Sequence, residues 1–192
     1  MLVGAMAAGA LLGPSPALAG TASHSGTTLT FRGYAGEANT LTVSKVSVSD
    51  GRGRARTTVK MFRLSDSTAK VSAGAGCSRD SAQTVLCPVQ RVSRLVLLGG
   101  DGNDVLKNNT GTRSHLAGND GDDVLIGGFG NDTMRGGRGY DVHSGRGGDD
   151  SIATRGTFAD RISCGAGHDT VQADALDHIA NNCEVIDMTA WF

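Results

Sequence analysis

The chain has 192 residues, of which 39% are hydrophobic and only 4% aromatic, and its formal net charge is −1. The near-neutrality hides two unlike parts, because residues 1–98 carry a net charge of +7 and residues 99–192 carry −8. A basic part with so few aromatic side chains lacks the stacking groups of a nucleic-acid surface, so no nucleic-acid partner is expected. The acidic part requires cations.

Residues 1–19 have the features of an export signal. An apolar stretch from Leu2 to Gly13 is followed by two prolines and by Ala17-Leu18-Ala19, a small-x-small cleavage motif. The stretch is too short to span a bilayer. No Lys or Arg precedes Arg32, which leaves open either an upstream start codon or an unusual signal. We expect a secreted protein that begins at or near Gly20 and has no membrane span.

Residues 20–98 are predicted to form a β-rich region. Runs of apolar and β-branched residues predict strands at 29–32, 41–48, 57–62, 84–86 and 91–98, separated by Gly, Asp and Ser turns. A slip in the alternation between Val43 and Val46 predicts a β-bulge. The arginines at 52, 54 and 56 follow the turn signal Asp50-Gly51 and are interpreted as a solvated hairpin tip, with contact to an anionic surface polymer or nucleic acid as the weaker alternative. Whether these strands join the following fold or form a separate sandwich is left open.

The most regular part of the chain is a run of four nine-residue units from 118 to 153, GNDGDDVLI, GGFGNDTMR, GGRGYDVHS and GRGGDDSIA. Each unit has Asp at its sixth position, and the eighth position is apolar except at His143. A further full unit begins at Gly99, and weaker units begin at Arg155 and Cys164. The unit from Asn109 is degenerate, with Ser114 in place of the aspartate. A flexible linker has no such spacing and no apolar phase.

Over residues 99–172 this run resembles the RTX (haemolysin-type) calcium-binding repeat, and most of the chain resembles small secreted actinobacterial proteins of that type. The resemblance implies an all-β fold, a parallel β-roll in which six residues form a loop and three a strand. Two units then make one coil, and loops on one edge stack about 4.8 Å apart. Asp123 would face Asp141, and Asp132 would face Asp150.

The resemblance also implies calcium ligands. The carboxylate ligands would be Asp104, Asp123, Asp132, Asp141, Asp150, Asp160 and Asp169, and the main-chain oxygens would come from Gly100, Gly102, Asn119, Gly121, Gly128, Gly130, Gly137, Gly139 and Gly148. The firmest sites pair loop 118–123 with 136–141 and loop 127–132 with 145–150, whereas Ser114 and residues 155–158 make the adjoining sites doubtful. Asp101, Asp120, Asp122 and Asp149 are either ligands or solvated loop residues. Oxygen ligands without thiolates favour calcium, which accepts more flexible coordination than magnesium.

Simple energetics predict that calcium binding and folding are one event. Stacked carboxylates repel each other by up to roughly 3 kcal/mol at an effective dielectric constant near 20. Ordering one unit costs on the order of 9 kcal/mol of backbone entropy, whereas burying its Leu or Ile returns only about 1.5 to 3 kcal/mol. A divalent ion between the loops is therefore expected to be part of the fold.

The four cysteines of an exported chain predict two disulfides, for which three pairings exist. Proximity in sequence favours Cys77 with Cys87 and Cys164 with Cys183. Zinc binding is the weaker alternative because no C-x-x-C pair is present. The second bridge would make residues 173–192 a cap over the open end of the roll.

Catalytic motifs are missing from the sequence. H-E-x-x-H and G-x-S-x-G do not occur, and the five histidines are scattered, so we expect no enzyme. The predicted function is that of an exported protein that binds several Ca²⁺ ions and folds on binding them. The alternative is a calcium-stiffened adhesin or carbohydrate-binding surface protein, which the scarcity of aromatic residues disfavours. The sequence identifies no protein or glycan partner.

Overall fold

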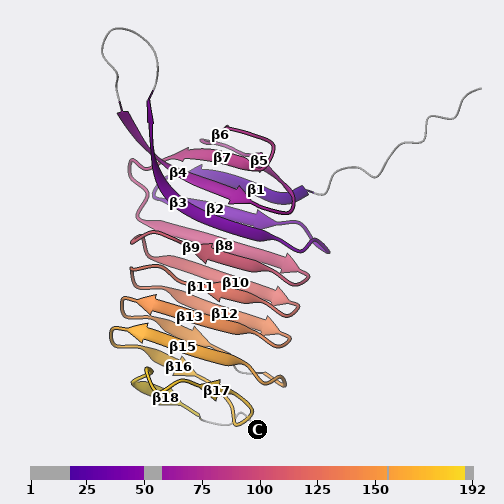
Figure 1. Cartoon of the computed structure of the whole chain (residues 1–192), viewed down its shortest axis with the longest axis vertical. Helices are drawn as coiled ribbons and strands as arrows, with labels where there is room; N and C mark the ends of the chain where they lie inside the picture. The colour runs from indigo at the N-terminus through magenta and orange to yellow at the C-terminus, as the bar shows by residue number, and fades with distance from the viewer. Residues whose placement is uncertain (1–17, 50–57, 155, 189–192) are drawn as a thin grey trace, which may run out of the picture.

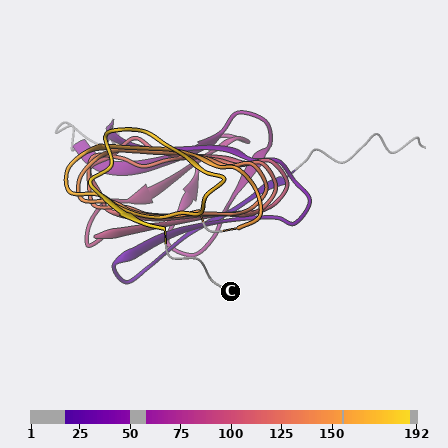
Figure 2. The ribbon, with the colours of Figure 1, turned by 90° about the horizontal axis from the view of Figure 1, so that it is seen from below.

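The computed structural model describes residues 18–49, 58–154 and 156–188, and the regular elements in these ranges are all β-strands. The strands stack into an elongated column with the N-terminal strands at one end and the C-terminal strands at the other (Figure 1). Seen along the column, the chain winds as a flattened coil with two layers (Figure 2). The described ranges contain no helix long and apolar enough to cross a membrane.

The two layers are two nine-stranded sheets. In its spatial order, the first sheet consists of β18 (Val185–Asp187), β16 (Thr170–Gln172), β14 (Ser151–Ala153), β12 (Thr133–Arg138), β10 (Ser114–Asp120), β8 (Arg94–Asp101), β2 (Thr28–Gly33), β1 (Leu18–Ser25) and β5 (Lys70–Ala73). The second consists of β17 (His178–Ile179), β15 (Arg161–Ala166), β13 (Val142–Gly147), β11 (Val124–Ile126), β9 (Val105–Asn108), β3 (Thr40–Ser49), β4 (Thr58–Asp66), β7 (Thr84–Pro88) and β6 (Ser78–Arg79).

From β8 onward the chain forms the predicted parallel β-roll. Successive strands alternate between the sheets, and each pairs in parallel with the strand two places along the chain. Val124 lies beside Val142, which is 18 residues further on. The spacing grows to 19 where Val142 lies beside Arg161, because the extra residue Thr154 falls within that coil. The nine-residue period of the sequence therefore corresponds to half a coil.

The N-terminal strands extend the same two sheets. β2 pairs in parallel with β8, and β3 pairs in parallel with β9, where Leu41 lies beside Leu106. Beyond them, β1, β4, β6 and β7 add antiparallel neighbours, and β5 adds a parallel one to β1. The question left open by the sequence has a clear answer, since these strands continue the column and do not form a separate sandwich.

The predicted bulge in the strand around residue 45 is wrong. β3 and β4 pair in one continuous antiparallel register along the whole of β3 from Leu41. The alternation weakens because the hairpin runs past the end of the opposite layer (Figure 1). Val43 is therefore buried, whereas Val46 and Val48 are half-exposed. The hairpin tip with its three arginines, 50–57, lies outside the described residues.

The core of the roll is a thin layer between the sheets. Eighth-position side chains point into it, and the fully buried ones are Leu106, Leu116, Leu125, Met134, Ile152 and Val171. His143 holds the same position and is 1% exposed. Each nonapeptide thus adds only one large core side chain, worth about 1.5 to 3 kcal/mol when buried, and the remaining residues form loops and surface.

Both disulfides join the cysteines that lie close in sequence. Cys77 is bonded to Cys87, and Cys164 to Cys183. Cys87 and Cys164 are fully buried in the two strands β7 and β15, so each bridge ties a loop to the core. The second bridge fastens the segment before β18 to the last full coil, and the described residues contain no free cysteine.

Candidate metal centre

The sixth-position aspartates form two columns, one at each edge of the flattened coil. One column contains Asp104, Asp123, Asp141 and Asp160, and the other contains Asp132, Asp150 and Asp169. All seven are at most 2% exposed. Each carboxylate follows directly on a tight loop and precedes a strand whose pairing register fixes its height in the column. The loops stack because the strands do.

A main-chain hydrogen bond links each aspartate to the next one in its column. The backbone N–H of Asp123 donates to Oδ1 of Asp141 at 2.9 Å, and the N–H of Asp132 donates to Oδ1 of Asp150 at 2.8 Å. The same bond joins Asp104 to Asp123, Asp141 to Asp160 and Asp150 to Asp169, at 2.8 Å each. The structure therefore brings together the aspartate pairs that the resemblance implies.

The second carboxylate oxygen of most of these aspartates has no partner in the protein. Oδ2 is buried and accepts no hydrogen bond in Asp104, Asp123, Asp141, Asp150 and Asp169. Leaving a buried acceptor unpaired is costly, and more so for a charged group. Stacked carboxylates, each with one oxygen held and one oxygen free, fit a hard divalent cation such as calcium, which takes oxygen ligands.

Burial raises the pKa of these carboxyl groups. Loss of solvent is the largest cause, and it raises the pKa of Asp123, Asp150 and Asp160 to about 7 and that of Asp141 to about 6. The hydrogen bond from the preceding aspartate N–H opposes this rise, and neighbouring carboxylates add to it. The pKa values of Asp104 and Asp132 are raised by burial as well. Protons and cations therefore compete for the same oxygens near neutral pH.

Main-chain oxygens of one loop face glycines of the next. The carbonyl oxygens of Asn119 and Gly121 lie where side chains on Gly137 and Gly139 would begin, so any Cβ there would clash with them. Gly137 and Gly139 have φ of +126° and +123°, which disfavours other residues. The glycines thus keep a space between stacked loops into which carbonyl oxygens project, as a calcium site requires.

Seven of the nine predicted main-chain ligand residues have this left-handed backbone, and Gly128 and Gly130 do not. The seven are Gly100, Gly102, Asn119, Gly121, Gly137, Gly139 and Gly148. In the exceptional loop, the N–H of Gly128 donates to Oδ2 of Asp132 at 2.6 Å, and Ser114 donates to Oδ1 of Asp132 through its N–H and hydroxyl. Both oxygens of Asp132 already have partners. This loop differs from loop 118–123, although their sequences predict equal sites.

The loop of the degenerate unit that begins at Asn109 is held in place by side-chain hydrogen bonds. Oδ1 of Asn108 accepts bonds from the N–H and hydroxyl of Thr110, and its Nδ2 donates to Thr112 O and Ser114 Oγ. These four residues are all at most 8% exposed. The loop therefore satisfies its own polar groups, which is a role that the sequence pattern did not predict for Asn108.

Two acidic residues outside the repeat phase end the columns. The N–H of Asp160 donates to Oδ1 of Asp177, and the N–H of Asp169 donates to Oε2 of Glu184, both at 2.9 Å. Asp177 uses its other oxygen to accept bonds from Thr154 and Asp174. No repeat signal marks Asp177 or Glu184, because their segment has lost the nine-residue spacing.

The acids whose role the sequence left open lie outside the two columns. Oδ1 of Asp122 accepts a bond from the N–H of Tyr140, and Oδ1 of Asp149 accepts one from the N–H of His168. Asp120 lies 3.7 Å from Arg138, and Asp101 is exposed. Among the described residues, no three acidic, histidine or cysteine side chains gather as a metal site. The carboxylates meet in pairs, so an ion bound there would need carbonyl oxygens as its remaining ligands.

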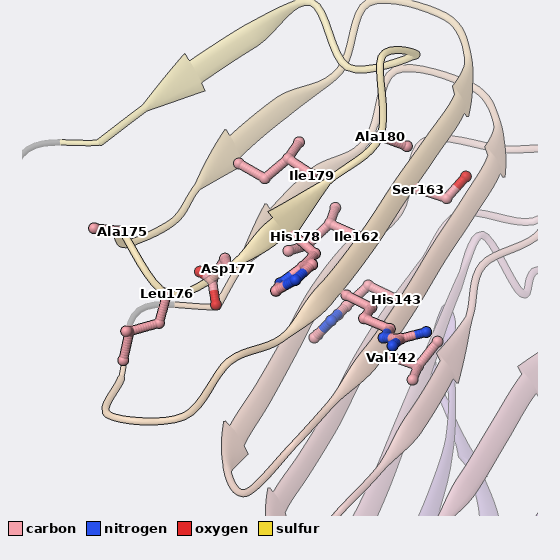
Figure 3. Close-up of a pocket in the computed structure, with 11 residues that line it drawn as sticks. Val142, His143, Ile162, Ser163, Ala175, Leu176, Asp177, His178, Ile179 and Ala180 are labelled. Carbon is pink, nitrogen blue, oxygen red and sulfur yellow. The ribbon is translucent and has the colours of Figure 1, made fainter.

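A separate hollow of about 720 Å³ lies at the C-terminal end, between β13, β15, β17 and the segment before β17 (Figure 3). Two histidines line it. His143 shares the inner face of its sheet with Ile162, whereas His178 lies beside Arg161 on the outer face. The hollow therefore does not bring the two histidines together as an acid–base pair.

Comparison with known proteins agrees with this geometry. Residues 96–114 and 110–142 match the model of the RTX calcium-binding nonapeptide repeat, in four copies. No curated protein matches the chain, and no solved structure does. The matched residues include Asp104, Asp123, Asp132 and Asp141, whereas Asp150, Asp160 and Asp169 lie beyond the match. Residues 96–142 therefore match the calcium-binding nonapeptide repeat of the RTX family, and they lie within the parallel β-roll.

Proposed function

We propose that the protein is exported and that its repeats fold around several Ca²⁺ ions held between stacked loops. The unpartnered Oδ2 atoms of the buried aspartates carry this proposal. Burial raises the pKa of Asp104, Asp123, Asp141 and Asp150 and so favours their protonated form. A cation beside these carboxylates would favour the ionised form. The ion would also screen the repulsion between Asp123 and its neighbours Asp104 and Asp141, both of which raise its pKa.

The five aspartates with a free Oδ2 mark the preferred ion positions. Asp104, Asp123 and Asp141 would each hold an ion against the following loop on one edge, and Asp150 and Asp169 would do so on the other. Carbonyl oxygens of residues such as Asn119 and Gly121 would complete the coordination. We assign a lower rank to Asp132, whose two oxygens are already hydrogen-bonded.

Calorimetric titration of the mature chain tests the proposal. Calcium should bind with a stoichiometry above one, and magnesium should bind weakly because its octahedron is too small and rigid for these loops. A chain that takes up no calcium at neutral pH contradicts the proposed function.

Export is supported by the leader-like segment and by the two disulfides, since disulfides persist in oxidising compartments. Residues 1–17 lie outside the described residues. Ala19, the predicted last residue of the leader, is fully buried in β1. Cleavage after Ala19 would therefore remove one core methyl group and leave Gly20 at the start of β1. Sequencing the N-terminus of the protein recovered from the culture medium tests both export and the cleavage position.

A second candidate function, binding to an anionic surface polymer, is favoured by the outer face of the first sheet. Arg32, Arg94, Arg113 and Arg135 are exposed there on or beside β2, β8, β10 and β12. His115 lies among them, and its pKa is lowered by burial and by the charges of Arg94 and Arg135. A flat cationic strip of this kind would attract a sulfated or carboxylated polysaccharide at moderate ionic strength.

Salt elution from a sulfated polysaccharide matrix tests this second candidate. The double variant Arg94→Gln/Arg135→Gln should elute at lower salt than the wild type. Arg161→Gln, on the outer face of the other sheet, is the matched control and should elute like the wild type. Equal elution of all three proteins contradicts a binding role for the strip.

A further inference from the structure

The loop at 33–39 occupies the place of one more repeat loop. The strands that flank it pair with the strands that flank loop 99–104, so that Arg32 lies beside Leu98 and Thr40 beside Val105. Asn39 therefore stands one coil before Asp104 in the same column. Its segment, GYAGEANTL, has Gly, Asn and Leu in the order of the repeat but is one residue longer before the Asn.

Asn39 makes the main-chain contact that the repeat aspartates make. Its backbone N–H donates to Oδ1 of Asp104 at 2.6 Å, as the N–H of Asp104 donates to Oδ1 of Asp123 at 2.8 Å. A Cβ placed on Gly33 would lie 2.9 Å from Nδ2 of Asn39, and one on Gly99 would clash with Oδ2 of Asp104. Nδ2 of Asn39 thus takes the place that Oδ2 takes in the repeats.

Three oxygen atoms converge on this Nδ2. It donates to the carbonyl oxygen of Glu37 at 3.0 Å, to that of Gly99 at 3.2 Å and to Oδ1 of Asp104 at 2.8 Å. Asn39 is fully buried, and its Oδ1 has no partner. The three acceptors also determine the orientation of the amide, since the opposite orientation would set Oδ1 against three oxygens.

The same surroundings explain why the repeat loops need an ion. An oxygen at this position faces three acceptors, namely a carbonyl of its own loop, a carbonyl of the next loop and the next carboxylate. A carboxylate oxygen cannot donate a hydrogen bond to any of them. Oδ2 of Asp104 is accordingly without a partner. A Cβ built on Gly99 would meet both this Oδ2 and, at 3.0 Å, the carbonyl oxygen of Gly118, so the two oxygens lie near each other. An amide NH₂ supplies two donors where a carboxylate supplies none.

We propose that the side-chain amide of Asn39 replaces the bound cation in the first coil of this column. The coil that contains β2 and β3 then folds without calcium. Its two strands offer ordered edges with which β8 and β9 can pair. The repeats would add to these edges coil by coil as calcium binds, so the proposal rests on the proposed function of the repeats. Beyond this coil, the antiparallel strands β1, β4 and β7 cover the N-terminal end of the column, where a solenoid requires a cap.

Calcium stoichiometry in three versions of the full chain tests the proposal. Asn39→Asp should bind one more Ca²⁺ per chain than the wild type, because it restores a carboxylate among three oxygens. Asn39→Leu should lower the melting temperature without changing the number of ions. The reverse substitution Asp141→Asn should lower the count by one. An Asn39→Asp chain that binds the same number of ions as a calcium-binding wild type overturns the proposal.

Amide hydrogen exchange in a calcium chelator at pH 8 gives a second, independent result. In the wild type, β2 and β3 should stay protected while the coils from β10 onward exchange. Asn39→Asp should abolish the protection of β2 and β3 more completely than Asn39→Leu, and calcium should restore it only in the former. If the wild type binds no calcium, the proposed function fails, but the chelator comparison still decides this proposal. Protection that is equal in Asn39→Asp and the wild type overturns it.

Discussion

The backbone N–H of Asp123 donates a 2.9 Å hydrogen bond to Oδ1 of Asp141, one coil further along the roll. Oδ2 of both residues is buried without a partner. Each carboxylate is thus fixed in place by one oxygen and keeps the other for a ligand. Strand pairing alone thus stacks carboxylates that each keep one oxygen free, which is the arrangement on which the proposed calcium sites rest.

Two aspartates at equivalent positions should differ in their contribution to calcium binding. Asp123→Asn should reduce the calorimetric stoichiometry by one ion, because the free Oδ2 is lost. Asp132→Asn should leave the stoichiometry unchanged, since Gly128 and Ser114 already donate to the Asp132 carboxylate. Equal losses in the two variants would show that the loop around Gly128 rearranges to bind an ion.

Protonation should partly replace calcium in stabilising the roll. Burial raises the pKa of Asp123, Asp150 and Asp160 to about 7 in the folded chain without an ion. A raised carboxyl pKa stabilises the fold below the unfolded value near 4, and this contribution is lost as the pH rises through about 7. In a chelator, lowering the pH from 8 to 5 should therefore increase the folded fraction of the coils.

Circular dichroism in a chelator at several pH values measures this gain. The β signal should rise as the pH falls from 8 to 5, whereas in saturating calcium it should not depend on pH over that range. A β signal in the chelator that does not change with pH contradicts the raised pKa values.

His143 should lower the stability of the roll. Both of its ring nitrogens are buried without a partner, and burial lowers its pKa to about 4. It lies between Leu125 and Ile162 in the core. Replacing it in His143→Leu should raise the free energy of unfolding in saturating calcium by about 1 to 3 kcal/mol, the cost of unpaired buried polar groups.

Chemical denaturation of the calcium-bound chain checks this value. Leu125→His is the matched control, because it places a second histidine at the neighbouring core position and should destabilise by a similar amount. A His143→Leu protein less stable than the wild type would reveal a required partner for the imidazole.

The disulfide between Cys164 and Cys183 should support the last ion position. It holds the segment that carries Glu184, whose carboxylate accepts a bond from the Asp169 N–H. Cys164→Ser/Cys183→Ser should lower stability by about 2 to 4 kcal/mol and weaken the last calcium bound. Cys77→Ser/Cys87→Ser, at the other end of the column, should leave every calcium affinity unchanged. A titration in which both double variants lose the same ion contradicts this assignment.

The resemblance of the repeats to the RTX nonapeptide was sufficient to predict the roll, and the nine-residue period then placed Asp123 opposite Asp141. It was not sufficient for Asp132, since the conformation of that loop depends on Ser114 one coil earlier. Asn39 was missed because one additional residue, Ala38, breaks the spacing and an amide replaces the acid. The bulge near Lys45 was predicted wrongly because alternation reports burial, and β3 leaves the column there. The cysteine pairs followed from proximity in sequence.

Far-ultraviolet circular dichroism of the mature chain during a calcium titration tests the central claim most directly. In a chelator at neutral pH, the coils from β10 to β16 should be largely disordered, and calcium should produce a cooperative gain of β signal. The gain should be lost again on adding excess chelator. A spectrum with full β signal in the chelator and no change on adding calcium would contradict the coupling of ion binding to folding.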